Sequence, residues 1–238
     1  MSILCVDCGN TRIKWGLRDG GRWRAVGALP TAQAPCLDGA LPGRPQRIVA
    51  CNVAGPATAA QIEALAQSLD APLSWLRAEA SRCGVTNGYE NPVQLGADRW
   101  AALIGARGLH DGACLVVNAG TATTVDVLDA AGVFQGGLIL PGVALMQAAL
   151  ARNTAGLPQA RGEFRELPRN TDDAIASGCL AATAGAVERM FASMAARSSA
   201  LCLLSGGAAP ELAPLLDVPL RRVENLVLEG LARVALEG

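Results

Sequence analysis

Residues 7–15 read D-C-G-N-T-R-I-K-W, and they join two short segments that have the pattern of β-strands. Residues 3–7 form a short apolar run, and beyond the turn Ile13, Trp15 and Leu17 alternate with charged residues or glycine. A period of two predicts a strand and not a helix. Gly and Asn between the segments are typical turn residues. The stretch therefore predicts a β-hairpin at the start of the fold.

The second half of the chain repeats this arrangement. Residues 118–121 read N-A-G-T and follow a short apolar strand expected at 114–118. Two unrelated hairpin turns are one explanation, because such turns are common. A duplicated unit is the other, and it predicts an α/β fold of two similar lobes, residues 1–112 and 113–238. Further strands are expected at 47–51, 73–77, 123–128, 133–140 and 201–205, and helices at 57–70, 98–107, 143–153, 173–196 and 224–236.

The composition excludes several classes of protein. The 238 residues carry a formal charge of -1, and no run of like charges suggests a nucleic-acid partner. The longest apolar run, around 138–146, is interrupted by Pro and Gly and is too short for a membrane helix. The N-terminus does not read as a signal peptide. We therefore expect a cytoplasmic protein with neither nucleic acid nor membrane as a partner.

The cysteines and the single histidine favour structural roles over redox or metal chemistry. Eight cysteines are scattered through mostly apolar segments, as expected of reduced, buried thiols. Cys5 and Cys8 form a C-x-x-C pair, but the pair ends a strand, whereas a redox pair usually opens a helix. His110 is the only histidine, which excludes a metal site with several histidines.

The first turn has the chemistry of a phosphate site. Glycine after a strand lets backbone N–H groups converge on phosphate oxygens, and Asn10 and Thr11 add side-chain donors. Lys14, the only lysine, can reach a phosphate from the next strand, although coding bias alone could explain its presence. Asp7 is suited to Mg²⁺, directly or through water, because Mg²⁺ usually takes one or two protein carboxylates. No Walker motif is present.

A second constellation lies in G-A-D-R, residues 96–99, at the start of an expected helix. Asp98 has two interpretations: an ordinary N-cap, or a general base that faces a hydroxyl nucleophile. In the second case Arg99 would bind an anionic group of the substrate, and Tyr89, the only tyrosine, could pack on it. The S-G-G turn at 205–207 could approach a nucleoside, but alone it is a common turn.

Six stretches follow one another along most of the chain: D-C-G-N-T-R-I-K-W (7–15), N-G-Y-E-N-P (87–92), G-A-D-R-W (96–100), N-A-G-T-A-T-T-V-D (118–126), G-G-L-I-L-P-G (136–142) and N-T-D-D-A-I-A-S-G (170–178). Together these motifs resemble those of type III pantothenate kinases, members of the acetate-kinase/sugar-kinase/Hsp70/actin superfamily. The resemblance implies two actin-like (ribonuclease H-like) lobes with mixed sheets flanked by helices, and an ATP site in the cleft between the lobes.

The resemblance also implies an activity. Such an enzyme phosphorylates pantothenate to 4'-phosphopantothenate with ATP, the first step of coenzyme A synthesis, as a cytoplasmic homodimer that uses Mg²⁺ and a monovalent cation. The alternative is a non-catalytic nucleotide-binding regulator on the same fold, because fold alone does not fix function. A regulator need not keep a general base and substrate residues together with the phosphate turn, so their presence favours the kinase.

Residue roles follow from the same resemblance. Asp98 is the implied proton acceptor, and Thr171 is implied to reach pantothenate across a dimer interface. The implied ATP-binding residues are Asp7, Cys8, Gly9, Asn10, Thr11, Arg12, Ile13, Lys14, Gly120 and Thr121. The implied pantothenate-binding residues are Tyr89, Gly96, Ala97, Asp98, Arg99 and Thr171.

One position departs from the family pattern. The second phosphate motif of the family begins with Asp, which binds K⁺ or NH₄⁺, and here it begins with Asn118. An amide oxygen can coordinate a cation but carries no charge, so the monovalent-cation site is in doubt. Asp126, later in the same motif, is either a second acidic group near the metal or a strand residue that faces solvent, and the second reading is slightly favoured.

Overall fold

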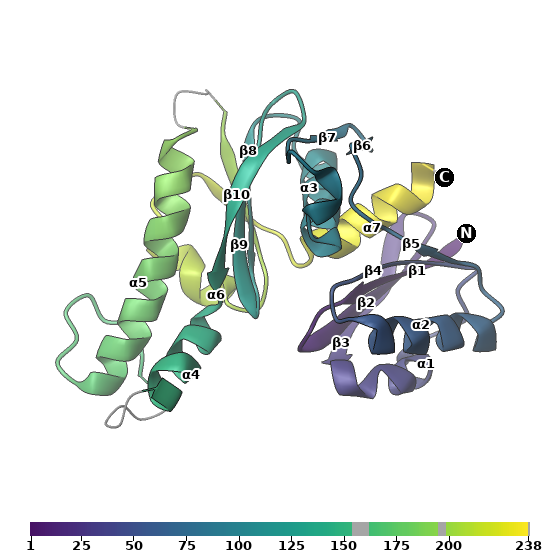
Figure 1. The fold of residues 1–238 in the computed structure, drawn as a ribbon, viewed down its shortest axis with the longest axis horizontal. Coiled ribbons are helices and arrows are strands. Elements are labelled where there is room, and N and C mark those ends of the chain that lie inside the picture. Colours follow the sequence, from purple (N-terminus) through teal and green to yellow (C-terminus); the bar gives the residue numbers. More distant parts are fainter. Residues whose placement is uncertain (154–161, 195–198, 238) are drawn as a thin grey trace. The chain divides into compact units, whose positions relative to one another are not determined.

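The computed structural model describes residues 1–153, 162–194 and 199–237. The chain divides into two compact units. Unit 1 consists of residues 1–111, 132–135 and 225–238, and unit 2 of residues 112–131 and 136–224. The strands form a five-stranded sheet, which lies in unit 1, and a seven-stranded sheet, whose last two strands belong to unit 1 and whose other strands lie mainly in unit 2. The two units are described separately below (Figure 1).

Unit 1 contains a five-stranded sheet in the order β3-β2-β1-β4-β5. The predicted hairpin is present: β1 pairs antiparallel with β2, and β2 with β3. β4 joins the other side of β1 in parallel, and β5 joins β4 in parallel, so the sheet is mixed. The strands are β1 (Ser2–Cys8), β2 (Arg12–Asp19), β3 (Arg22–Pro30), β4 (Arg47–Asn52) and β5 (Leu73–Trp75).

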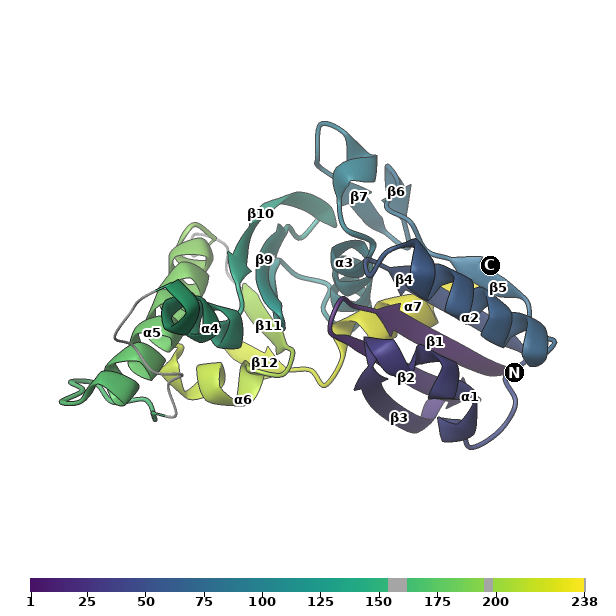
Figure 2. The same cartoon turned by 60° about the horizontal axis from the view of Figure 1, so that its bottom comes forward.

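Helices flank both faces of this sheet (Figures 1 and 2). One face packs its apolar residues on α2 (Pro56–Ser68), together with η1 (Thr31–Cys36) and α1 (Leu37–Ala40). The other face contacts α3 (Ala97–Leu109) and α7 (Leu226–Glu237), which pack on each other. Gly105 and Gly230 lie at this helix contact, where a Cβ atom would collide with backbone of the facing helix. Glycine is therefore required at both positions for the close approach.

A small substructure completes unit 1. It comprises β6 (Ser81–Arg82), β7 (Val85–Asn87) and η2 (Pro92–Gln94), within a polar stretch for which the sequence predicted no strand. The first residues of β10 pair in parallel with β7, with Phe134 opposite Asn87. Short polar strands carry little periodic signal. β6 pairs only with its neighbour β7, and β7 depends on β10, a partner that is distant in the sequence.

Unit 2 repeats the architecture. Its strands follow the order β12-β11-β8-β9-β10, in which β8 and β9 form an antiparallel hairpin and β11 joins β8 in parallel. The core lies between this sheet and α5, with α4 and α6 beside it. The elements are β8 (Cys114–Ala119), β9 (Ala122–Leu128), β10 (Val133–Pro141), α4 (Val143–Asn153), α5 (Thr171–Ala192), β11 (Leu201–Ser205), α6 (Ala209–Leu212), η3 (Ala213–Leu215) and β12 (Leu220–Arg222).

The two strand orders are equivalent when β10-β9-β8-β11-β12 is set beside β3-β2-β1-β4-β5. The duplicated α/β unit predicted from the two turns is therefore confirmed, and the reading as unrelated hairpins is wrong. The division at 112/113 stays a prediction, although residues 132–135 and the described residues from 225 onwards make their contacts within unit 1. The helix expected at 173–196 ends at Ala192 in the structure, and residues 195 and 196 lie outside the described residues.

Within the residues described by the structure, no helix is long and apolar enough to cross a membrane.

Candidate functional site

A row of three polar side chains crosses the centre of the unit 1 sheet. Asp7 on β1 pairs in register with Lys14 on β2 and with Cys51 on β4. These three side chains are named the first row below. Cys8, next to Asp7, and Ile13, next to Lys14, pack in the core on the α2 face of the sheet. Because side chains alternate along a strand, the first row lies on the opposite face, which contacts α3 and α7. The hairpin thus presents a carboxylate beside an amine on one surface.

Asp7 lies in an unusual electrostatic environment. Its side chain is only 6% exposed, and it accepts a hydrogen bond from the Cys51 thiol with a sulfur–oxygen distance of 3.6 Å. The pKa of Asp7 is raised from 3.8 to about 6, mainly by burial; the positive charge of Lys14 lowers it, and the negative charge of Asp98 raises it. Buried thiols resist ionisation as well, and burial raises the pKa of Cys51 well above its ordinary value. A cation bound beside Asp7 would therefore stabilise its ionised form.

The turn after Asp7 is held by its own hydrogen bonds. The Gly9 N–H donates to the Arg12 carbonyl at 3.2 Å, and Thr31 Oγ1 donates to the Gly9 carbonyl at 2.7 Å. The Gly9 amide is thus used inside the turn, although the sequence placed it in a phosphate nest. Asn10, Thr11 and Arg12 are exposed at the tip, where a phosphate could approach. The side chains of Cys8 and Ile13 are buried in the core, so only their backbone could contribute to a nucleotide site.

The G-A-D-R motif forms the first turn of α3. The N-cap is Gly96, so the prediction that Asp98 is the N-cap is wrong. Asp98 is half-buried inside the first turn, and its Oδ1 accepts a hydrogen bond from the Arg99 amide at 2.8 Å. A side chain at Gly96 would press on the Asp98 carboxylate. Since the Asp98 charge raises the pKa of Asp7, the two carboxylates lie within electrostatic range of each other.

Arg99, Tyr89 and Phe134 form a compact cluster. Arg99 Nη1 donates to Tyr89 Oη at 2.8 Å, and the guanidinium carbon lies 5.6 Å from the Tyr89 ring centre and 5.7 Å from that of Phe134. The two rings are 5.2 Å apart. The predicted pairing of Tyr89 with Arg99 is thus present. Phe134 was not predicted, because no local pattern marks the start of a strand as a site residue.

The second turn lies in unit 2. Asn118 on β8 pairs in register with Thr124 on β9 and with Ser205 on β11, and these three form the second row. The Gly120 N–H donates to the Ala122 carbonyl at 3.0 Å, so this glycine amide is also used inside its turn. Thr121 is exposed.

Two later glycine motifs pack against this second turn. The Gly142 N–H donates to the Thr121 carbonyl at 2.9 Å, and a Cβ atom on Gly142 would collide with the Gly120 and Thr121 backbone. Gly206, at φ +103°, lies against the backbone of Ala119 in the same way. The S-G-G turn thus supports the second turn.

Asp126 does not face solvent, so that reading is wrong. Its side chain is 1% exposed, and it lies on β9 two residues after Thr124, on the same sheet face as Asn118. Asn118 itself is half-buried. The amide and the carboxylate therefore share the face that carries the second row.

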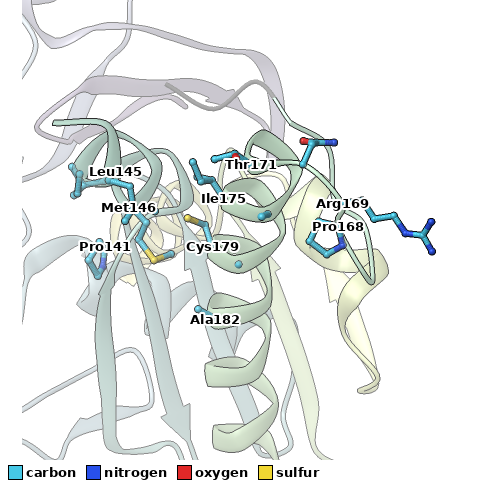
Figure 3. Close-up of a pocket in the computed structure, with 14 residues that line it drawn as sticks. Pro141, Leu145, Met146, Pro168, Arg169, Thr171, Ile175, Cys179 and Ala182 are labelled. Carbon is cyan, nitrogen blue, oxygen red and sulfur yellow. The ribbon is translucent and has the colours of Figure 1, made fainter. Parts of the chain in front are cut away.

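Thr171 is the first residue of α5, where the Asn170 side chain accepts a hydrogen bond from the Asp173 N–H at 2.9 Å and caps the helix. Thr171 lines a mostly apolar cavity of about 1090 Å³ between α4 and α5, together with Leu145, Met146 and Ile175 (Figure 3). Thr171 and the G-A-D-R residues belong to different units.

The donor set fits a hard divalent cation held with few protein ligands. In the described part of the chain, no three His, Cys, Asp or Glu side chains form a metal cluster. Mg²⁺ needs no such cluster, because it keeps several waters and commonly binds one or two carboxylates plus substrate phosphates. Asp7 is a carboxylate of this kind. Two carboxylates, an amine and a guanidinium lie in one unit, and groups of this kind are suited to phosphoryl transfer onto an anionic alcohol.

Comparison with solved structures places the fold. A Sinorhizobium meliloti protein provisionally assigned as a 2-dehydro-3-deoxygalactonokinase aligns with a TM-score of 0.65 at 17% identity, over 99% of this chain and 98% of that one. A Campylobacter jejuni protein provisionally assigned to the Baf family of transcriptional activators aligns with a TM-score of 0.62 at 21% identity, over 98% of each chain. These likenesses concern the fold alone, an α/β architecture of two mixed sheets flanked by helices.

Sequence comparison is far closer. The sequence model of the type III pantothenate kinase family matches residues 3–193. A type III pantothenate kinase of Aromatoleum aromaticum is 58% identical over 99% of this chain and 98% of its own length. One from Azoarcus sp. strain BH72 is 53% identical, over 98% of this chain and 90% of its own length.

Proposed function

This chain belongs to the type III pantothenate kinase family, and we propose that it transfers the γ-phosphoryl group of ATP to the primary hydroxyl of pantothenate, giving 4'-phosphopantothenate for coenzyme A synthesis in the cytoplasm. The observation that carries the proposal is that Asp98, Arg99 and Tyr89 lie in the same unit as Asp7 and Lys14, with the two carboxylates in electrostatic range.

We assign the substrate chemistry to α3. Asp98 accepts the proton of the attacking hydroxyl, and its position is supported by the hydrogen bond from the Arg99 amide. Arg99 pairs with the pantothenate carboxylate, for which a planar guanidinium is well matched. Gly96 and Ala97 let the substrate approach the first turn of the helix, because neither has a bulky side chain.

We assign the nucleotide to the first turn and the first row. The exposed tip residues approach the phosphates, and Lys14 supplies a positive charge to them. A divalent metal comes with ATP in this family, and we propose Mg²⁺ on Asp7, directly or through water. When bound, the metal neutralises charge that develops on the phosphates. The raised pKa of Asp7 supports this role, because a cation would stabilise its ionised form.

The second turn is proposed as a further phosphate contact through Gly120 and Thr121. Asn118 is proposed as a weak ligand for K⁺ or NH₄⁺, through its amide oxygen alone. The buried carboxylate of Asp126 on the same sheet face offers a source of negative charge for such a cation.

We also propose a homodimer in which Thr171 completes the pantothenate site of the neighbouring subunit. Its exposure at the start of α5, beside an apolar cavity, supports this role. Subunits with Asp98→Asn and subunits with Thr171→Val, inactive alone, should regain up to about a quarter of wild-type activity when mixed, because one site per mixed dimer is intact. No recovery despite proven subunit exchange would contradict the shared site.

The test of the activity itself is direct. Purified protein with ATP, Mg²⁺ and labelled pantothenate should yield labelled 4'-phosphopantothenate and ADP in equal amounts. The rival function, a nucleotide-binding regulator, predicts ATP binding without turnover under the same conditions. Asp98→Asn protein serves as the control, because it should bind ATP but form little product.

A further inference from the structure

We infer that Phe134 is a positioning residue: it fixes the plane of the Arg99 guanidinium and thereby selects a substrate that ends in a carboxylate. The inference rests on the proposed function, since it concerns how the same site recognises pantothenate. Phe134 is fully buried, and it belongs to residues 132–135, which join unit 1 although the chain on both sides belongs to unit 2.

The contacts of Arg99 carry the argument. Its guanidinium lies within 6 Å of two aromatic ring centres, those of Tyr89 and Phe134, which is the range of a cation–π attraction. The Tyr89 hydroxyl accepts a hydrogen bond from Nη1. Arg99 is 5% exposed, so these neighbours act on a largely desolvated charge, for which such attractions are stronger than in water.

The N-G-Y-E-N-P motif is shaped around the backbone of Phe134. Asn87 pairs with Phe134 in the β7–β10 ladder, and its side chain accepts from the Tyr89 N–H and donates to the Pro92 carbonyl, both at 3.1 Å. A side chain on Gly88 would collide with the Phe134 carbonyl. The loop that carries Tyr89 can therefore pack this closely against the backbone of Phe134 only with glycine at position 88.

A fixed guanidinium plane matters for specificity. A carboxylate is recognised best by two parallel hydrogen bonds from the guanidinium fork, and this geometry is lost when the plane rotates. Phe134 and Tyr89 restrict that rotation from two sides. We therefore expect loss of Phe134 to weaken the recognition of a carboxylate much more than that of a neutral end group.

The experiment compares Phe134→Leu with wild type on pantothenate and on panthenol, its analogue with an alcohol in place of the carboxylate. The variant should raise KM for pantothenate about five- to thirty-fold, with kcat and KM for ATP within about twofold, and should reduce the preference for pantothenate over panthenol. Phe191→Leu, the same change at a buried phenyl of α5, should leave KM for pantothenate and KM for ATP unchanged. Equal losses for pantothenate and panthenol, or for pantothenate and ATP, would overturn the inference.

A measurement without turnover separates this inference from the proposed function. The Arg99 Nε–Hε signal, assigned by its disappearance in Arg99→Lys, should show a lower NMR order parameter in ligand-free Phe134→Leu protein than in wild type. An unchanged order parameter would overturn the positioning role even in an active kinase. Absence of product from the wild-type enzyme would instead contradict the proposed function.

A double-mutant cycle completes the test. If Phe134 acts through Arg99, then Phe134→Leu should add little to the loss in kcat/KM for pantothenate already caused by Arg99→Lys. Additive losses would mean that Phe134 acts independently of Arg99 and would contradict the inference.

Discussion

The first row, Lys14–Asp7–Cys51, and the second row, Thr124–Asn118–Ser205, occupy equivalent places in two sheets of the same strand order. In the first row a carboxylate lies between an amine and a thiol. In the second an amide lies between two hydroxyls. The backbone plan has been repeated, whereas the charges of the first row have no counterpart in the second.

The turns that follow the rows also differ. The first hairpin closes with Cys8 opposite Ile13, and the second with Ala119 opposite Thr123, so the second loop is one residue shorter. Both tips are exposed, but the backbone of the second turn is packed against two glycine motifs. The fold therefore supplies two similar turns, and the side chains of each row make the two turns chemically different, with charged groups only in the first row.

The largest effect is expected at Asp98 on α3, because we propose it as the base that accepts the proton of the attacking hydroxyl. Asp98→Asn should lower kcat on the order of 10²–10⁴-fold, as is typical for loss of a general base, with the fold intact. Steady-state kinetics and circular dichroism check this. Asp217→Asn, at an exposed carboxylate of unit 2, is the matched control and should keep wild-type rates. A near-normal kcat for Asp98→Asn would remove Asp98 from the mechanism.

Asp7→Asn makes the first row resemble the second. It should lower kcat/KM for ATP on the order of 10²–10³-fold and raise the Mg²⁺ concentration needed for half-maximal rate, because the carboxylate proposed to hold Mg²⁺ at the phosphates is lost. A Mg²⁺ titration at saturating pantothenate measures this. An unchanged Mg²⁺ requirement would mean that Asp7 does not serve the metal.

The same variant should be more stable than wild type at neutral pH. A carboxyl pKa raised from 3.8 to about 6 means that the folded state disfavours the ionised form, by about 3 kcal/mol once the pH exceeds both values. Ionisation of Asp7 therefore destabilises the folded state, and this destabilisation grows as the pH rises from 3.8 to about 6. Urea unfolding should show Asp7→Asn to be more stable at pH 7, with the gain vanishing below pH 4. A loss of stability at pH 7 would contradict the raised pKa.

Lys14→Thr places in the first row the residue found opposite Asn118. It should raise KM for ATP about tenfold and change KM for pantothenate much less, because a point charge near the phosphates is lost. Lys14→Arg should recover part of the loss, since the guanidinium fork differs in geometry from an ammonium group. Equal changes in both KM values would mean that Lys14 does not contact the phosphates.

The smallest effect is expected when a carboxylate, as in the first row, is introduced into the second row. Asn118→Asp should increase the dependence of kcat/KM for ATP on K⁺, because the added carboxylate near the ATP phosphates needs neutralising. Wild type should depend on K⁺ only weakly. The measurement is a K⁺ titration at constant ionic strength set by a large organic cation. Strong K⁺ activation of wild type would indicate a working cation site built with the amide.

The repeated hairpins were predictable because their alternation and their glycine turns are local. Residues 201–205 were predicted as a strand and form one, and the helix predicted at 98–107 spans Ala97–Leu109. Of the two interpretations of Asp98, the N-cap is wrong because Gly96 already provides the non-helical residue before the first turn. A polar residue near a helix start can lie one or two positions beyond the cap, and only the backbone conformation distinguishes these cases.

The rest depended on partners distant in sequence. Phe134 is part of the site because β10 pairs with β7, and nothing in residues 132–135 indicates that pairing. The solvent-facing interpretation of Asp126, one of two that the sequence allowed, is wrong because the side chain is buried. The hydrogen bond between Cys51 and Asp7 follows from the register of two strands that are separated by the first hairpin and by η1.

The discontinuity of unit 1 has a consequence for synthesis on the ribosome. The helix α3, which carries Asp98 and Arg99, packs on α7. Because α7 lies near the C-terminus, α3 leaves the exit tunnel long before α7 is synthesised. Strands β8, β11 and β12 and helix α5, by contrast, have all emerged before α7 does. At typical translation rates of about 5–20 residues per second, the side of α3 that packs on α7 stays uncovered for seconds. A chain that stops before α7 would therefore retain every proposed catalytic residue and yet lack the support of the helix that carries them.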